Sequence, residues 1–151
     1  MNSRILAIDP GASGGLAFGD SRKPPMLISM PETLHDLIET IRGADCEHAF
    51  VEQVGGFIGK AQPGSAMFNF GQNYGQILGV LATLEVPYTL VRPQAWQKSL
   101  SLGTSTGMSK TEWKNKLKAK AQQLYPNIKI TLSTADACLI WHAAKTDRIQ
   151  P

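Results

Sequence analysis

Three carboxylic acids in this chain are associated with apolar segments that lie far apart in the sequence. Asp9 and Glu52 each follow directly after an apolar run, and Asp136 lies inside one. A buried carboxylate costs free energy unless a partner compensates its charge. Each acid alone is compatible with a helix cap or a strand end in water. Together they favour three converging oxygen ligands of the kind that Mg²⁺ prefers.

The size and composition predict one globular domain that spans residues 1–151. Apolar residues make up 42% of the chain and charged residues 18%, and the net charge is +3. No segment approaches the roughly 20 apolar residues that a membrane span needs, so we expect no membrane association. The N-terminus has no signal-peptide pattern, and the two widely spaced cysteines, Cys46 and Cys138, indicate reduced thiols of a cytoplasmic protein.

The order of apolar runs and turn residues predicts an α/β fold. Expected strands lie at 4–9, 16–19, 26–30, 47–53 and 88–91. Expected helices lie at 33–43, 65–84, 109–125 and 134–145, and residues 92–96 are expected to form a turn into a short helix. The first three strands are joined by tight turns and form an antiparallel meander. The later strands alternate with helices, which favours a central five-stranded mixed sheet flanked by helices.

This arrangement predicts where the acids lie. Asp9 and Glu52 fall at the ends of adjacent strands. Asp136 falls in the first turn of the last helix, for which Ser133 is the expected N-cap. All three are therefore expected at the strand ends, where α/β folds usually place ligands.

Two further patterns each have two interpretations. In the expected helix 65–84, Gly71, Gly75 and Gly79 recur every four residues, which indicates close approach to another element. We favour packing on the domain's own sheet over a contact between subunits. Five lysines crowd residues 110–120 with only Glu112 to balance them. They form either a solvated helix face or a surface that binds phosphate.

Four segments resemble the RuvC family of Holliday junction resolvases, which have the RNase H-like fold. The first strand and its acid match the family's first motif, and the segments around Glu52 and Asp136 match two others. A fourth segment, around Trp96, is similar to one common in phage-type members. The segments are residues 5–11, 51–54 with 70–75, 135–140 and 91–98. The likeness covers nearly the whole chain.

The sequence departs from this family at one position. Members usually carry a fourth acid or a histidine one helical turn before the last aspartate. Here Ser133 stands in that position. Serine is a poor metal ligand, so the second metal position is either incomplete or completed by another group such as a water molecule.

The resemblance implies a structure-selective endonuclease that resolves four-way DNA junctions by Mg²⁺-dependent phosphodiester hydrolysis. Asp9 bridges two Mg²⁺ ions in this scheme, Glu52 holds one and Asp136 the other, and Mn²⁺ is expected to substitute. The expected partners are branched DNA and a second copy of the chain in a homodimer, in the cytoplasm of a bacterial or phage-infected cell. The expected DNA contacts are Phe57, Lys60, Arg92, Lys98, Lys110, Lys114 and Lys118. Phe57 either stacks on a base at the opened crossover or covers the domain's own surface.

Three alternatives stay open. Another RNase H-like Mg²⁺ nuclease, acting on flaps, branched DNA or RNA–DNA hybrids, has the same acids. A junction-binding protein with weakened catalysis is suggested by Ser133. The glycine-rich turn after Asp9 also resembles the phosphate-binding turn of actin-like ATPases, but that fold needs two such domains and a much longer chain.

Overall fold

The computed structural model describes residues 3–55 and 63–151. The predictions for Phe57 and Lys60 therefore lie outside the described residues. In chain order the elements are β1 (Arg4–Asp9), β2 (Gly15–Asp20), β3 (Met26–Ser29), α1 (Leu34–Ala44), β4 (His48–Glu52), α2 (Gly64–Thr83), β5 (Tyr88–Val91), α3 (Pro93–Ser99), α4 (Lys110–Leu124) and α5 (Ala135–Lys145).

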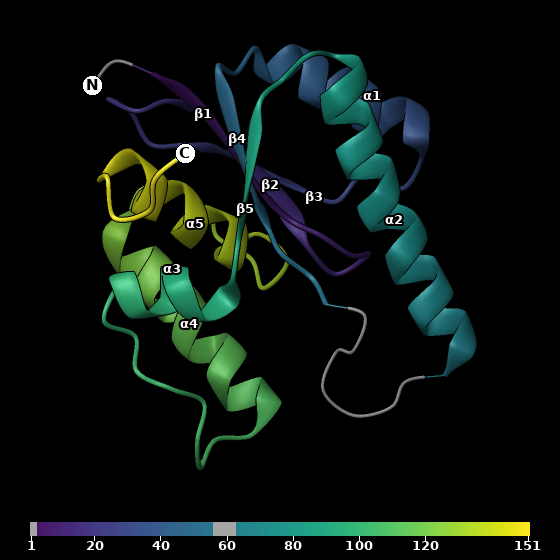
Figure 1. Ribbon diagram of the computed structural model, residues 1–151. Coiled ribbons are helices and arrows are strands. Elements are labelled where there is room, and N and C mark those ends of the chain that lie inside the picture. Colours follow the sequence, from purple (N-terminus) through teal and green to yellow (C-terminus); the bar gives the residue numbers. More distant parts are fainter. Residues whose placement is uncertain (1–2, 56–62) are drawn as a thin grey trace.

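The described strands form one mixed sheet in the order β3-β2-β1-β4-β5 (Figure 1). The pairs β1–β2 and β2–β3 are antiparallel, and the pairs β1–β4 and β4–β5 are parallel. Tight turns join the antiparallel strands, whereas each parallel pair needs a crossover that contains a helix. The predicted α/β architecture with a central five-stranded mixed sheet is confirmed.

The side chains of β1 alternate between the two faces of the sheet, and each face has its own apolar core. Leu6 and Ile8 belong to the core beneath α1 and α2. Ile5 and Ala7 belong to the core that contains the buried residues of α5. Because successive side chains of a strand point to opposite faces, Asp9 shares the face of Ile5 and Ala7.

The same rule places Glu52 on that face. In β4, Phe50 belongs to the α5 core and Val51 to the core on the other side. Glu52 follows Val51, so its side chain points to the α5 face. Ile8 of β1 is paired with Val51, which sets the two acids side by side at adjacent strand ends.

Helix α5 is buried on nearly all of its surface. Its buried residues are Ala135, Ala137, Cys138, Leu139, Ile140, Trp141, Ala143 and Ala144. The indole nitrogen of Trp141 donates a hydrogen bond to the carbonyl oxygen of Ile5, at 3.1 Å. This bond ties α5 directly to β1, the central strand of the sheet.

Several predicted helix ends differ from the structure, and two of these differences have a clear physical cause. The N-cap of α5 is Thr134 rather than Ser133. Thr134 Oγ1 accepts a hydrogen bond from the backbone N–H of Thr131, which closes the turn before the helix and leaves the Ser133 hydroxyl to other partners. Helix α1 ends at Ala44 rather than Gly43, because Asp45 adopts the left-handed conformation that terminates it.

The expectation that the glycines of α2 pack on the domain's own sheet is wrong. A Cβ atom at Gly71, Gly75 or Gly79 meets nothing within 4 Å. The core face of α2 is formed instead by Ile77, Val80 and Leu81. Residues two apart on an α-helix lie about 200° apart, so Gly75 and Gly79 point away from Ile77 and the core. The glycine stripe is therefore on the open side of the helix.

No helix in the described ranges is both long enough and apolar enough to pass through a membrane.

Candidate metal centre

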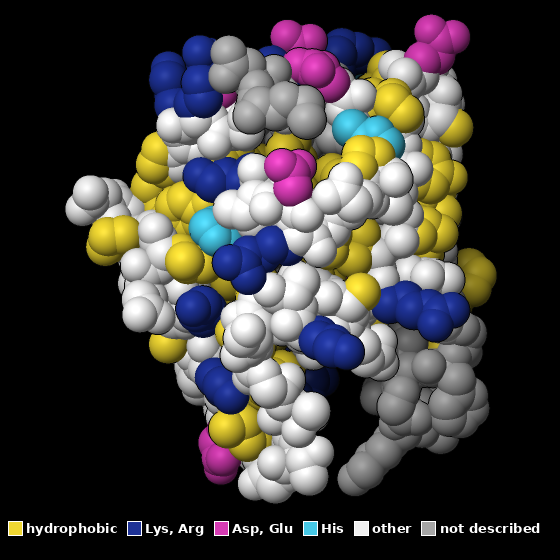
Figure 2. Space-filling model, turned by 60° about the vertical axis from the view of Figure 1, so that its left-hand side comes forward, with side chains coloured by type: hydrophobic (Ala, Val, Ile, Leu, Met, Phe, Trp, Pro, Cys, Tyr) yellow, Lys and Arg dark blue, Asp and Glu magenta, His cyan; other side chains and the backbone are white. Residues whose placement is uncertain are grey.

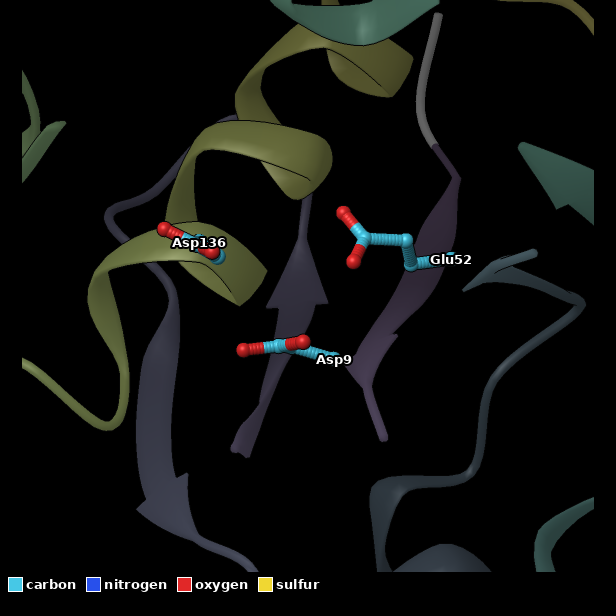
Figure 3. A group of neighbouring side chains, drawn as sticks. All are labelled: Asp9, Glu52 and Asp136. Carbon is cyan, nitrogen blue, oxygen red and sulfur yellow. The ribbon is translucent and has the colours of Figure 1, made fainter. Parts of the chain in front are cut away.

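The three predicted acids meet at one end of the sheet (Figure 3). Asp9 lies at the end of β1, Glu52 at the end of β4 and Asp136 in the first turn of α5. One carboxylate oxygen from each lies within 4.8 Å of the others, and all three residues are partly buried. The structure thus brings together side chains that are separated by more than 40 positions in the sequence.

A glycine-rich turn brings the first strand pair close to the start of α5. Gly15 of β2 is paired with Asp9. A Cβ atom at Gly15 would lie 2.7 Å from the backbone oxygen of Ser133 and 2.8 Å from that of Ile28. Only glycine allows this approach, which places the segment before Asp136 directly against the sheet.

The turn after Asp9 is held by helix α2. The backbone N–H of Gly11 donates a hydrogen bond to Oδ1 of Asn73, at 2.7 Å. Gly11 has a φ of +104°, a conformation that side-chain-bearing residues rarely adopt. This hydrogen bond fixes the turn that leaves Asp9. Sequence analysis assigned no role to Asn73.

Glu52 is held from the other side by helix α3. The indole Nε1 of Trp96 donates a hydrogen bond to Oε2 of Glu52, at 2.8 Å. Trp96 is fully buried. The sequence segment around Trp96 contributed to the family resemblance, but nothing in it indicated that its side chain reaches Glu52.

Ser133 takes part in a chain of hydroxyl groups beside the acids. Its Oγ lies 2.7 Å from Oγ of Ser29 and 2.9 Å from Oγ1 of Thr131. Thr131 Oγ1 is in turn 3.0 Å from Oγ1 of Thr134. Ser133, where the family resemblance led us to expect an acid or a histidine, is therefore engaged with other hydroxyl groups.

The electrostatics of the cluster favour a bound cation. Burial raises the pKa of Asp9 well above its usual range, and the neighbouring Glu52 and Asp136 raise it further. Burial also raises the pKa of Glu52 to about 7, although the Trp96 hydrogen bond opposes this shift. Burial raises the pKa of Asp136 as well. Three crowded carboxylates repel one another, and a divalent cation removes that repulsion.

Lys114 of α4 lies near enough to influence the whole cluster. Its positive charge lowers the pKa of Asp9, Glu52 and Asp136 against the larger effect of burial. No salt bridge within 4.0 Å joins Lys114 to an acid in the described parts of the chain. Lys114, which we predict to contact phosphate, therefore lies close to the acids. Sequence spacing alone did not indicate this.

The other predicted basic contacts lie on α3 and α4. Arg92 precedes α3, Lys98 lies in its last turn, and both side chains are exposed. Lys110 and Lys118 lie one turn of α4 on either side of Lys114. Figure 2 shows Lys and Arg side chains spread over the face that contains these helices, with few acidic side chains among them. This distribution is compatible with contact to a phosphate backbone.

The donor set fits a hard divalent cation. All three ligands are carboxylate oxygens, and no histidine or cysteine joins a metal-binding group with them in the described residues. Oxygen-only ligand sets suit Mg²⁺, Ca²⁺ and Mn²⁺ rather than zinc or copper. The three acids lie at the corners of a triangle (Figure 3), and they come from the neighbouring strands β1 and β4 and from helix α5.

Comparison with solved structures identifies the fold. Thermus thermophilus RuvC matches the chain with a TM-score of 0.61 at 15% identity, over 96% of this chain and 95% of that one. One of these RuvC structures is a complex with a Holliday junction substrate. The chain has the RuvC fold.

A second resolvase has the same fold. Ydc2, the yeast mitochondrial Holliday junction resolvase, matches with a TM-score of 0.55 at 13% identity, over 97% of this chain and 79% of that one. No family model and no curated protein sequence matches the chain. The likeness is therefore carried by the three-dimensional arrangement, including the RuvC-type mixed sheet, rather than by sequence identity.

Proposed function

We propose that this protein is a Mg²⁺-dependent endonuclease that resolves four-way DNA junctions. The observation that carries the proposal is the meeting of Asp9, Glu52 and Asp136 at one end of a RuvC-type sheet. Partly buried carboxylates with raised pKa values are costly for a fold, and such perturbed groups cluster at functional sites. The activity named for both structural neighbours supplies the substrate class.

We assign separate roles in the reaction to the three acids and to Lys114. Bound divalent cations activate a water molecule and stabilise the oxygen that leaves the cleaved phosphodiester. Asp9 would be a ligand shared by two such cations, and Glu52 and Asp136 would each hold one of them. The positive charge of Lys114 faces the same space and attracts the phosphate that is to be cut.

The basic residues of α3 and α4 position the DNA backbone around this site. The proposed contacts on these elements are Arg92, Lys98, Lys110, Lys114 and Lys118. They supply affinity that is independent of sequence and sensitive to salt. Phe57 and Lys60, outside the described residues, stay predictions: Phe57 for the opening of the crossover and Lys60 for a phosphate contact.

A homodimer fits the two-fold symmetry of a four-way junction, because two sites then face two equivalent strands. The open side of α2 supports this part of the proposal. A Cβ atom at Gly71, Gly75 or Gly79 would meet nothing within 4 Å, and Phe68 on the same helix is 71% exposed. Replacement of Gly75 by Arg on that open side should convert a dimer to a monomer in light scattering, with little change in thermal stability.

A panel of DNA structures tests the proposed function. The wild type should cut a mobile four-way junction at paired symmetric positions, and it should cut linear duplex, flaps and RNA–DNA hybrids far more slowly. Mn²⁺ should replace Mg²⁺. Preferential cleavage of flaps or hybrids would instead assign the site to another nuclease of the same fold. The proposed place of action is the cytoplasm of a bacterial or phage-infected cell.

A weakened nuclease is the second candidate, and one observation favours it. Ser133, where the family resemblance led us to expect an acid or a histidine, is occupied by hydrogen bonds to Ser29 and Thr131. A protein of this kind would bind junctions selectively and cut them slowly even at high Mg²⁺. The same cleavage panel, combined with junction binding, separates the two candidates.

A further inference from the structure

Trp96 lies outside the group of three acids and contacts one of them. It is fully buried in helix α3, and its Nε1–H donates to Oε2 of Glu52 at 2.8 Å. The strand pairing explains why Trp96 lies next to Glu52. Glu52 is paired with Val91 of β5, and α3 begins at Pro93, so the first turns of α3 stand beside the end of β4.

The choice of acceptor is what distinguishes this bond from ordinary packing. A buried indole N–H needs a hydrogen-bond acceptor wherever it lies. Trp141 satisfies that need with the backbone carbonyl of Ile5. Trp96 uses a carboxylate instead, and hydrogen bonds to charged acceptors are shorter and stronger than neutral ones.

The Trp96 hydrogen bond involves only one of the two carboxylate oxygens of Glu52. Oε2 is engaged by Trp96. Oε1 has no hydrogen-bond partner among the described residues, and Glu52 offers an oxygen to the space shared with Asp9 and Asp136. The hydrogen bond therefore restricts rotation of the Glu52 carboxylate, and each of its oxygens keeps a lone pair for a ligand.

We infer that Trp96 is a positioning residue that fixes the orientation of the Glu52 carboxylate and thereby favours Mg²⁺ over Ca²⁺. The inference rests on the proposed metal site and deepens it. Mg²⁺ demands near-ideal octahedral geometry and takes single carboxylate oxygens, whereas Ca²⁺ accepts more ligands and two-oxygen carboxylates. A Glu52 carboxylate that is free to turn would lose part of this preference.

Two matched variants test the inference. Trp96→Phe and Trp141→Phe each remove one indole hydrogen bond from a fully buried tryptophan, but only the first bond reaches the acids. The affinity for Mg²⁺ and for Ca²⁺ is measured for each purified variant by calorimetric titration, and by the rise in melting temperature relative to its own metal-free form. Neither readout requires catalysis.

Trp96→Phe should weaken Mg²⁺ binding about tenfold, the lower end of the range for residues that orient metal ligands. Ca²⁺ binding should change less, so the Mg²⁺/Ca²⁺ ratio falls. Trp141→Phe should leave both affinities within about twofold of the wild type. Equal Mg²⁺ affinity in Trp96→Phe and wild type overturns the inference. Equal losses in both variants also overturn it, because they indicate a general effect of core packing.

The unmodified protein provides a second test that does not depend on how well Trp96→Phe folds. The chain has three tryptophans, so three indole N–H signals are expected in a ¹⁵N–¹H spectrum. Trp113→Phe and Trp141→Phe assign the signal of Trp96 by elimination. On Mg²⁺ titration this signal should shift while that of Trp141 stays in place.

The outcomes separate this inference from the function on which it rests. A fixed Trp96 signal at saturating Mg²⁺ overturns the role of Trp96 and leaves the metal site intact. A wild type that binds no Mg²⁺ in calorimetry contradicts the metal site itself, and the role of Trp96 with it.

Discussion

Gly15 and Ser133 are in direct backbone contact, although 118 positions separate them: a Cβ atom at Gly15 would stand 2.7 Å from the Ser133 carbonyl oxygen. Gly15 is also the partner of Asp9 in the β1–β2 pair. One glycine therefore sets the distance between the strand that carries Asp9 and the segment that leads into Asp136. The spacing of two acids depends on the absence of a single methyl group.

Gly15→Ala should push these segments apart. Overpacking against rigid backbone costs about 1–3 kcal/mol of unfolding free energy, and Mg²⁺ binding should weaken together with stability. Gly43→Ala is the matched control, since a Cβ there meets nothing within 4 Å and the residue lies inside α1. That change should stabilise the protein by up to about 1 kcal/mol. Wild-type stability and Mg²⁺ affinity in Gly15→Ala would show that the contact does not set the site.

The metal-free protein should lose stability as the pH rises from about 4.5 to 7. Glu52 has an ordinary pKa of 4.5 when unfolded and about 7 when folded, mainly because of burial. In that window the folded state keeps a proton that the unfolded state has released, so unfolding becomes easier with rising pH. Glu52 alone accounts for on the order of 3 kcal/mol.

Chemical denaturation at several pH values, in EDTA and in Mg²⁺, measures this slope. Mg²⁺ binds the deprotonated acids, so its stabilising effect should grow with pH across the same window. Glu52→Gln cannot release the proton, and it should flatten the EDTA slope. A slope that is unchanged in Glu52→Gln would mean that this carboxyl is not the group responsible.

Ser133→Asp should lower the Mg²⁺ concentration that gives half-maximal cleavage. The new carboxylate adds the oxygen ligand that the family resemblance led us to expect at this position, and Ser29 and Thr131 can donate their hydroxyl hydrogens to it. Ser133→Ala serves as the control for loss of the existing hydrogen bonds. If Ser133→Asp needs as much Mg²⁺ as the wild type, or more, another group already completes the site.

Loss of Lys114 or Lys118 should weaken the binding of junction and duplex DNA alike. Each Lys→Gln change removes one phosphate contact, so the slope of log affinity against log salt should fall by about one unit. Lys23→Gln makes the same change of charge in the turn beyond Asp20, at the opposite end of β2 from Gly15, and should have no such effect. Gel-shift titrations at several salt concentrations measure this. Loss of junction preference in either α4 variant would indicate that these lysines read shape.

The sequence was sufficient to predict the sheet and the meeting of the acids. Apolar runs that end in Asp9 and Glu52 specify buried strands with an acid at the same end, and the burial of Asp136 in an apolar helix requires a charged or polar neighbour. These are local patterns of periodicity, which sequence reports well. The mixed sheet and the adjacency of the strands that carry Asp9 and Glu52 followed from the rule that helical crossovers join parallel strands, whereas the full strand order was not predicted.

The contacts that tune the site could not be predicted in this way. Trp96 and Glu52 lie 44 positions apart in the sequence, and their hydrogen bond depends on how α3 is positioned relative to β4. The cap of α5 was misplaced because Ser133 and Thr134 are chemically equivalent candidates, and only the turn at Thr131 decides between them. The glycines of α2 were assigned to the wrong side because a small-residue stripe indicates space without indicating which face is open.

Cleavage of a four-way junction by the wild type and by Asp9→Asn, with Mg²⁺ and with EDTA, tests the central claim most directly. Asp9 is the most strongly perturbed acid of the group, and asparagine keeps the shape of its side chain while it removes the charge. The wild type should cut the junction only with Mg²⁺. Asp9→Asn should bind the junction at least as tightly and cut it at least a thousandfold more slowly, on the order of the 4 kcal/mol lost with the metal's stabilisation of the reacting phosphate. Cleavage by Asp9→Asn at the wild-type rate, or undiminished wild-type cleavage in EDTA, would contradict the account.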